Sequence, residues 1–233
     1  MKIQMPENQI TKIADDIIVI EDFVPEIILN ILMEKVWRFD WPWFYLQDTT
    51  YRDKYNDSNK PTWDDGFSTL LYVRAEPGDD GHEGDEKPFI YKAFPYYDDV
   101  YPILSHMEFT LGLTMDTLKR VKVNLNTTAP TSEPFEPHID VTKYSTWTGL
   151  LCLNDSDGPT VIYDKKKPEG ILTAKGALDW YRENEKDFNV LCEVQPKKGR
   201  FVLFDGDYYH SGTRPSQHKN RVNLNINWYK QIP

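Results

Sequence analysis

Cysteine is scarce in this chain, and long apolar runs are missing. The two cysteines, Cys152 and Cys192, stand in the apolar contexts LLCLN and VLCEV. Two cysteines cannot build the framework of a disulfide-rich secreted protein, so we expect both to be buried reduced thiols. No stretch approaches the roughly 20 apolar residues of a membrane span, and the N-terminal MKIQMPENQITK lacks the apolar run of a signal peptide. These absences predict a soluble, cytoplasmic protein.

Positive charge is also in short supply. The chain has 27 Lys and Arg against 37 Asp and Glu, which gives a formal net charge of -10. Non-specific binding to nucleic acid depends on basic side chains that neutralise phosphates. Nucleic acid is therefore a disfavoured partner, although a local basic groove is compatible with this balance. A small molecule or a peptide is the favoured substrate, and the sequence does not indicate an oligomeric state.

The length and composition predict a single domain over residues 1–233, because a chain of this size with 39% apolar residues can bury a sizeable core. Residues 1–117 are interpreted as an N-terminal helical and loop part that packs on that core. Within it, IIVIEDFVPEIILNIL predicts a short strand and then a helix entered through Pro25. YYDDVYPILSHMEFTLGL predicts a helix interrupted at Pro102. Residues 75–88 predict an acidic loop.

Alternation of apolar and polar residues dominates residues 118–233, most clearly in RVKVNLN and RVNLNINW. Side chains of a strand point to opposite faces in turn, so each segment has one apolar face and one face rich in asparagine. Bulk water and a hydrogen-bonding cavity both suit such a polar face, and its composition favours the cavity. Further strands are predicted at 147–153, 160–163, 190–194 and 200–205, with a helix inserted at about 173–187. The pattern indicates a mainly β fold with flanking helices, arranged as a sandwich or barrel.

A histidine stands two residues before an aspartate in EPFEPHIDVTKY. On an extended segment His138 and Asp140 share a face and can meet one metal ion, while a chance pair on a turn and a hydrogen-bonded structural pair remain alternatives. GRFVLFDGDYYHSG supplies a further candidate ligand, His210, from a distant strand. Two histidines and one carboxylate leave one face of an octahedron open, as in non-haem Fe(II) oxygenases and unlike closed zinc sites. Arg221, at the start of RVNLNINW, offers a guanidinium fork to the carboxylate of a bound organic acid.

The order His138-x-Asp140, His210 and Arg221 resembles the Fe(II)/2-oxoglutarate-dependent dioxygenases, most nearly the prolyl-4-hydroxylase-like branch with its bacterial and phage relatives. The resemblance covers residues 118–228 and implies a double-stranded β-helix, the cupin-like jelly roll. It implies Fe(II) at the catalytic residues His138, Asp140 and His210, the C5 carboxylate of 2-oxoglutarate at Arg221, and O2 as the other cosubstrate. Further hydrogen bonds to 2-oxoglutarate would come from polar side chains nearby, namely Lys122, Asn124, Asn126, Thr148, Tyr163 and Asn223.

Some positions depart from the pattern of this family. Phe135 and Cys152 stand where relatives often place tyrosines beside 2-oxoglutarate. Arg214 is a rival anchor for the cosubstrate, but its turn SGTRPSQ is typical of a solvated or substrate-side cation. His218 lies in the same polar turn, and we place it outside the metal site.

The resemblance implies an oxidoreductase that hydroxylates a protein side chain, such as a prolyl residue, or a small metabolite, with release of succinate and CO2. A nucleobase demethylase of the same superfamily is an alternative, because RVNLNIN resembles the Arg-x-Asn-x-Thr-x-Arg stretch of that branch, with Asn227 in place of the last arginine. A non-catalytic jelly-roll binding or structural module is another. Specificity would reside in residues 47–88 and 164–187, which we expect to form lids over the open face of the iron.

Overall fold

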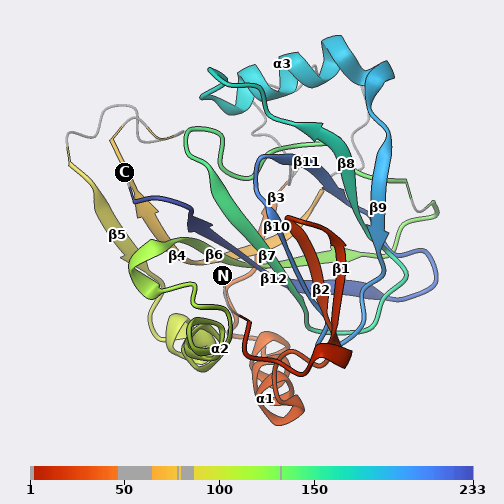
Figure 1. The fold of residues 1–233 in the computed structure, drawn as a ribbon. Coiled ribbons are helices and arrows are strands. Elements are labelled where there is room, and N and C mark those ends of the chain that lie inside the picture. The colour runs from red at the N-terminus through yellow and green to blue at the C-terminus, as the bar shows by residue number, and fades with distance from the viewer. Residues whose placement is uncertain (1–2, 47–64, 78, 80–86, 132, 233) are drawn as a thin grey trace.

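Two antiparallel sheets and three α-helices make up the part of the chain that the computed structural model describes, residues 3–46, 65–77, 79, 87–131 and 133–232 (Figure 1). The larger sheet has nine strands in the order β1-β2-β10-β7-β12-β6-β4-β3, with β5 paired to β4. Its strands are β1 (Ile10–Ala14), β2 (Ile17–Ile20), β3 (Phe44–Leu46), β4 (Gly66–Ala75), β5 (Phe89–Lys92), β6 (Leu118–Thr127), β7 (Thr146–Cys152), β10 (Phe201–Asp205) and β12 (Asn220–Tyr229).

The smaller sheet has the order β11-β8-β9. Its strands are β8 (Thr160–Lys166), β9 (Val190–Val194) and β11 (Tyr208–Gly212). The helices are α1 (Glu26–Val36), α2 (Tyr96–Leu111) and α3 (Ala174–Asn184), with short 3-10 helices at Glu7–Gln9, Met115–Thr117 and Glu185–Asp187. Arg221 of β12 donates to Thr160 of β8, so the two sheets face each other. The predicted mainly β jelly roll with flanking helices is confirmed.

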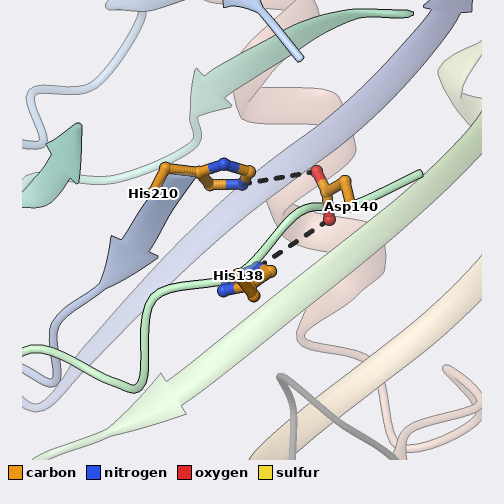
Figure 2. Close-up of side chains that lie close together, drawn as sticks. All are labelled: His138, Asp140 and His210. Atoms are coloured by element: carbon orange, nitrogen blue, oxygen red, sulfur yellow. Dashed lines mark ion pairs between the residues drawn. The ribbon is translucent and has the colours of Figure 1, made fainter. Parts of the chain in front are cut away.

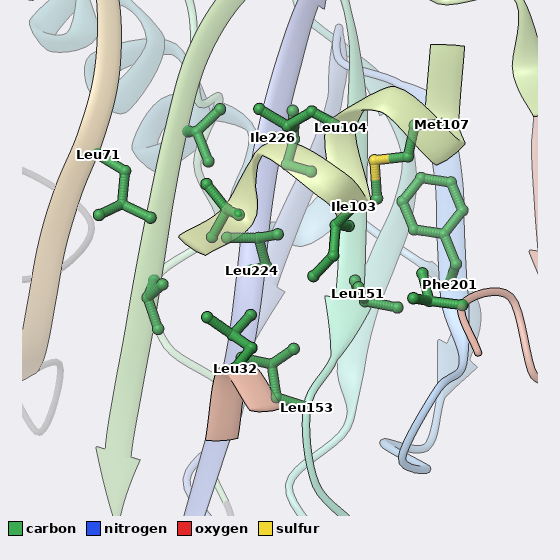
Figure 3. Close-up of a cluster of buried hydrophobic side chains, with 14 of the residues drawn as sticks. Leu32, Leu71, Ile103, Leu104, Met107, Leu151, Leu153, Phe201, Leu224 and Ile226 are labelled. Atoms are coloured by element: carbon green, nitrogen blue, oxygen red, sulfur yellow. The ribbon is translucent and has the colours of Figure 1, made fainter. Parts of the chain in front are cut away.

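One face of the larger sheet packs on α1 and α2 and forms the main core. Figure 3 shows Leu32 of α1 and Ile103, Leu104 and Met107 of α2 against side chains of the sheet. The apolar residues of both alternating segments are buried in this cluster, which includes Val121, Val123, Leu125, Val222, Leu224, Ile226 and Trp228. Burial of this kind contributes roughly 25 cal/mol per Å² of apolar surface, so this face fixes the register of β6 and β12.

The opposite face of β6 and β12 carries the asparagines, and it is not in bulk water. Asn223, Asn225 and Asn227 are all buried. Asn124 donates to Asn223 across the two strands, at 3.2 Å. The cavity interpretation of the alternating pattern is therefore confirmed, and the core on one face of the sheet aims this polar row into the space between the sheets.

Two features of residues 1–117 differ from the sequence-based expectation. The helix α2 runs unbroken through Pro102. Pro102 is exposed, so water can bond the carbonyl group of Asp98, which the proline leaves without an N–H partner. The same part of the chain also contributes β1 to β5 to the larger sheet, beyond the single strand that the sequence predicts.

Both cysteines are free thiols, as predicted; Cys152 is buried, whereas Cys192 is only partly buried and in this respect differs from the prediction. Among the described residues, none of the helices combines the length and the apolar character that crossing a membrane would require.

Asp157 fastens the connection between β11 and β12. Its carboxylate accepts backbone N–H bonds from Ser216, Gln217 and His218 at 2.9–3.0 Å, and further bonds from the Ser216 hydroxyl and the His218 ring. Burial opposes ionisation, but the N–H groups of His218, Ser216 and Gln217 outweigh it and hold the pKa of Asp157 well below its usual range. These hydrogen bonds hold in place the loop that joins β11, which carries His210, to β12, which carries Arg221.

Replacing Asp157 by asparagine is expected to lower the free energy of unfolding by about 1–3 kcal/mol at neutral pH, since backbone donors lose a charged acceptor. A depressed native pKa stabilises the fold above the unfolded-state pKa of about 4 and loses that effect as the pH falls. The difference from the wild type should therefore shrink below about pH 4. Urea unfolding at several pH values checks this, with Glu169→Gln at an exposed position as the control. Equal losses at all pH values would contradict it.

Candidate metal centre and adjoining cavity

The backbone places His138 and His210 side by side. They form an isolated antiparallel bridge in which His138 N donates to His210 O at 2.9 Å and His210 N donates to His138 O at 3.1 Å. His210 comes from β11, and His138 comes from the extended segment before β7. Because opposite residues of an antiparallel pair project to the same face, both imidazoles reach the same space.

The side chains of His138, Asp140 and His210 converge, with one ligand atom of each within 4.8 Å of the others (Figure 2). His138 Nε2 lies 3.9 Å from Asp140 Oδ1, and His210 Nε2 lies 3.6 Å from Asp140 Oδ2. The Asp140 and His210 side chains are 2% and 4% exposed, whereas that of His138 is 14% exposed. The cluster is thus closed behind Asp140 and His210 and more open beside His138.

Hydrogen bonds on the far side of each ring set the tautomers. His210 Nδ1 lies 3.0 Å from the carbonyl oxygen of Tyr208, and His138 Nδ1 lies 3.4 Å from that of Glu136. A carbonyl only accepts, so each Nδ1 carries the proton and each Nε2 keeps its lone pair. Burial and the neighbouring His210 lower the pKa of His138 to about 3, which keeps this ring neutral. A metal binds imidazole through an Nε2 that carries no proton, and this is the tautomer that the two Nδ1 contacts favour.

Asp140 is held by donors on both oxygens. Oδ1 accepts from Arg120 Nη2 at 2.7 Å, while Oδ2 accepts from Asn225 and Asn227 at 3.0 and 3.2 Å. Burial opposes ionisation, but the charges of Arg120 and Lys122 hold the pKa of Asp140 well below its usual range. The carboxylate is therefore ionised and fixed in direction. Sequence reasoning missed Arg120, although it stands on the polar face of RVKVNLN.

These residues fit a divalent transition metal. Within the described part of the chain, His210 Nε2 is buried without a hydrogen-bond partner, a costly state unless something else takes its lone pair. Two imidazole nitrogens and one carboxylate form the donor set that leaves positions open for other ligands in non-haem iron sites. The structure brings together the three residues that the sequence singled out.

Arg221 lies buried in the same cavity, 5% exposed. Its Nη2 donates to Thr160 Oγ1 at 2.7 Å, while its Nε, buried as well, has no hydrogen-bond partner among the described residues. A Cβ on Gly212 would lie 3.0 Å from Arg221 Nη1, so glycine leaves room for the guanidinium. A buried cation with an unused donor is suited to an anionic ligand.

The cavity has an empty volume of about 500 Å³, a figure that includes its open mouth. It is lined by Lys122, Asn124, Asn126, Phe135, His138, Leu150, Thr160, His210, Ser211, Gly212, Arg221, Asn223 and Asn225. Of the residues predicted to contact 2-oxoglutarate, Thr148 and Tyr163 stand just behind this lining. Thr148 accepts from Asn227, and the Tyr163 hydroxyl lies 3.3 Å from Ser211 Oγ.

The predicted lid role of residues 164–187 is wrong for the helix within them. Ile139, Tyr209 and three residues of α3, Ala177, Leu178 and Tyr181, form one buried cluster, and the Tyr209 hydroxyl donates to Ala177 O at 2.8 Å. Ile139 and Tyr209 alternate with the candidate ligands, so they point away from the metal face. Helix α3 therefore supports the ligands from behind. The other predicted lid, 47–88, falls largely on residues outside the described ranges.

Arg214 and His218, in the turn after β11, bond to other parts of the fold. Arg214 is buried and donates to Thr127 O, Thr127 Oγ1, Thr128 O and Asp65 Oδ1. The expectation of a solvated or substrate-side cation is therefore wrong, because two backbone carbonyls, a hydroxyl and a carboxylate hold the guanidinium inside the protein. His218 lies against Asp157, away from the metal cluster.

No family model matches this sequence, and no curated protein matches it. Solved structures do match. The non-heme alpha ketoglutarate dependent epimerase SnoN from nogalamycin biosynthesis aligns with 92% of this chain and 78% of its own, at 12% identity and a TM-score of 0.58. A 2OG-Fe(II) oxygenase family oxidoreductase from Burkholderia pseudomallei aligns with 99% of this chain and 96% of its own, at 11% identity and a TM-score of 0.55. AviO1 from Streptomyces viridochromogenes Tue57 aligns with 94% of this chain and 92% of its own, at 15% identity and a TM-score of 0.52. This chain has the fold of the 2-oxoglutarate and Fe(II)-dependent oxygenases.

Proposed function

We propose that the protein is an Fe(II)- and 2-oxoglutarate-dependent oxygenase. His138, Asp140 and His210 would hold Fe(II), and Arg221 with Thr160 would bind the C5 carboxylate of 2-oxoglutarate. The observation that carries the proposal is the presence, in one cavity, of a His-Asp-His cluster and a buried guanidinium with an unused donor. Similarity of fold adds support, since two of the matching structures are named as enzymes that use this cosubstrate or belong to this oxygenase family.

The protein's part in such a reaction is placement and shielding. Iron and 2-oxoglutarate, when bound, supply the oxidising chemistry that uses O2 and yields succinate and CO2. Arg120, Asn225 and Asn227 fix the carboxylate of Asp140, so its orientation does not depend on the metal. Burial of Asp140 and His210 keeps water from that side of the centre, and the side of His138 is left for the substrate.

Hydroxylation of a small metabolite or a protein side chain, as in the prolyl-4-hydroxylase-like branch, is the outcome we propose. The epimerase among the similar structures shows that this fold also carries another outcome. Nucleobase demethylation is less well supported, because Asn227 is bonded to Asp140, Arg120 and Thr148 instead of facing a base. The intact ligand cluster argues against a purely structural module. A cytoplasmic location stays a prediction.

Anaerobic addition of Fe(II) and then 2-oxoglutarate to the purified protein is expected to produce a visible charge-transfer band. Admission of O2 should then yield succinate, measured by mass spectrometry, in amounts that follow the consumption of 2-oxoglutarate. Fe(II) alone and 2-oxoglutarate alone should give neither signal. If the wild-type protein bound neither Fe(II) nor 2-oxoglutarate, the proposed function would be refuted, and a binding module with a polar cavity would be favoured.

A further inference from the structure

The charge of the cavity is opposite to that of the whole protein. The chain carries a formal net charge of -10. The residues that line the cavity nevertheless include two cations, Lys122 and Arg221, and no Asp or Glu of the described part of the chain. The single carboxylate of the centre, Asp140, lies behind the lining and is paired with Arg120. Such a pocket concentrates positive potential where a ligand binds.

Lys122 is a cation of this cavity whose nearest charged neighbour, Asp140, is shared with Arg120. Its Nζ lies 4.0 Å from Asp140 Oδ1, beyond hydrogen-bond distance, and that oxygen already accepts from Arg120 at 2.7 Å. No hydrogen bond of the Lys122 ammonium is found among the described residues, although its side chain is only 18% exposed. A largely buried ammonium with unused donors is costly, and an anionic ligand offsets that cost.

The sheet register separates Lys122 from Arg221. Lys122 lies opposite Asn225 of β12, whereas Arg221 lies opposite Asn126. The offset of four residues from Arg221 to Asn225 corresponds to about 13 Å along the strand. On its other side Lys122 lies opposite Leu70 of β4, which is 39% exposed. Lys122 thus stands between the metal cluster and an open stretch of the sheet.

The proposed cosubstrate does not neutralise this cation. Two charges of Fe(II) balance the two carboxylates of 2-oxoglutarate, and Asp140 balances Arg120. Arg221 and Lys122 then leave the loaded cavity with a formal excess of two positive charges. Arg221 is engaged with the C5 carboxylate, so Lys122 is the group left for the next ligand.

We propose that Lys122 binds a carboxylate of the primary substrate, so that the protein oxidises a small carboxylic acid rather than a neutral molecule. This inference rests on the proposed function and names the substrate class of the same site. It reassigns Lys122, which the sequence placed among the 2-oxoglutarate ligands.

The test uses the anaerobic complex of the full-length protein with Fe(II) and 2-oxoglutarate, and acetate as the probe, with acetamide as its neutral counterpart. In the wild type, acetate should shift the charge-transfer band in a saturable way, and acetamide should not. Lys122→Met should weaken the acetate response at least about tenfold, while the half-saturating 2-oxoglutarate concentration changes less than about threefold. Lys122→Arg should keep the response. The exposed Lys219→Met is the matched control.

Three outcomes would overturn the inference. The first is a wild-type complex whose band acetate does not alter. The second is an acetate response of the same strength in Lys122→Met. The third is a tenfold weaker binding of 2-oxoglutarate in Lys122→Met, which would make Lys122 a cosubstrate ligand. A wild type that forms no band at all would instead refute the proposed function, so the two failures are distinguishable.

Discussion

Replacing His210 by alanine is expected to weaken Fe(II) binding by more than about 100-fold, since loss of a residue that merely supports a ligand already costs 10- to 100-fold. His210 is the more enclosed of the two candidate imidazole ligands, and its Nε2 makes no hydrogen bond to the described residues. Succinate formation should fall with the metal affinity. Calorimetric titration of the anaerobic protein with Fe(II) gives the affinity independently of turnover.

Added imidazole provides a second readout of the same variant. It should restore part of the charge-transfer band, because the removed ring leaves a space of matching shape beside Phe204, whose ring centre lies 5.0 Å from that of His210. The control is His218→Ala, since the His218 side chain is exposed and contacts Asp157, not the residues of the cluster. Unchanged Fe(II) affinity in His210→Ala, with the variant folded, would show that the three side chains do not form a metal site.

Replacing Arg221 by methionine is expected to raise the half-saturating concentration of 2-oxoglutarate by about 30-fold or more, as removal of one partner of a buried charge pair costs about 2–5 kcal/mol. Lysine at this position keeps the charge but lacks the planar fork, so Arg221→Lys should fall between the methionine variant and the wild type. The titration is followed by the charge-transfer band.

Fe(II) affinity without 2-oxoglutarate should stay near the wild-type value in both Arg221 variants, because Arg221 makes its bond to Thr160 and not to the cluster. An unchanged Fe(II) affinity distinguishes a residue that binds the cosubstrate from one that merely supports the fold. The exposed Lys219→Met, two residues earlier in the chain, serves as the control for the loss of a positive charge. A 2-oxoglutarate titration that is unchanged in Arg221→Met would show that another side chain anchors the cosubstrate.

The sequence predicts the metal cluster because its members lie on segments with strong local patterns. His138 and Asp140 need only an extended backbone to share a face, and His210 follows an apolar strand that the core must bury. Alternation in β6 and β12 likewise determines which side chains face inward. Both features follow from the two-residue alternation of apolar and polar side chains, which can be seen in a single sequence.

The partners of Asp140 could not be predicted, because they depend on register. Pairing of β6 with β12 sets Arg120 opposite Asn227 and Lys122 opposite Asn225, and a slip of the register would change both pairs. Helix α3 was misplaced for a related reason. Its amphipathic pattern indicates a buried face but not the surface that it covers, and that surface proved to be Ile139 and Tyr209.

The strand β4 was missed because its pattern is irregular. Its burial does not alternate strictly, and the pairing with β6 shifts between Leu70 and Tyr72. Polar stretches on both sides of Gly66–Ala75 also hide it in the sequence. A bulge of this kind moves side chains to the other face and breaks the two-residue period on which prediction depends.

The contrast between an acidic exterior and a cationic interior has a consequence for kinetics. A dicarboxylate in solution is first repelled by the net charge of the protein and attracted only near the mouth of the cavity. Dissolved salt screens the long-range repulsion over about 10 Å at 0.1 M, but it acts much less on charges enclosed by the protein. Moderate ionic strength should thus raise the association rate of acidic ligands without raising their dissociation rate from the cavity.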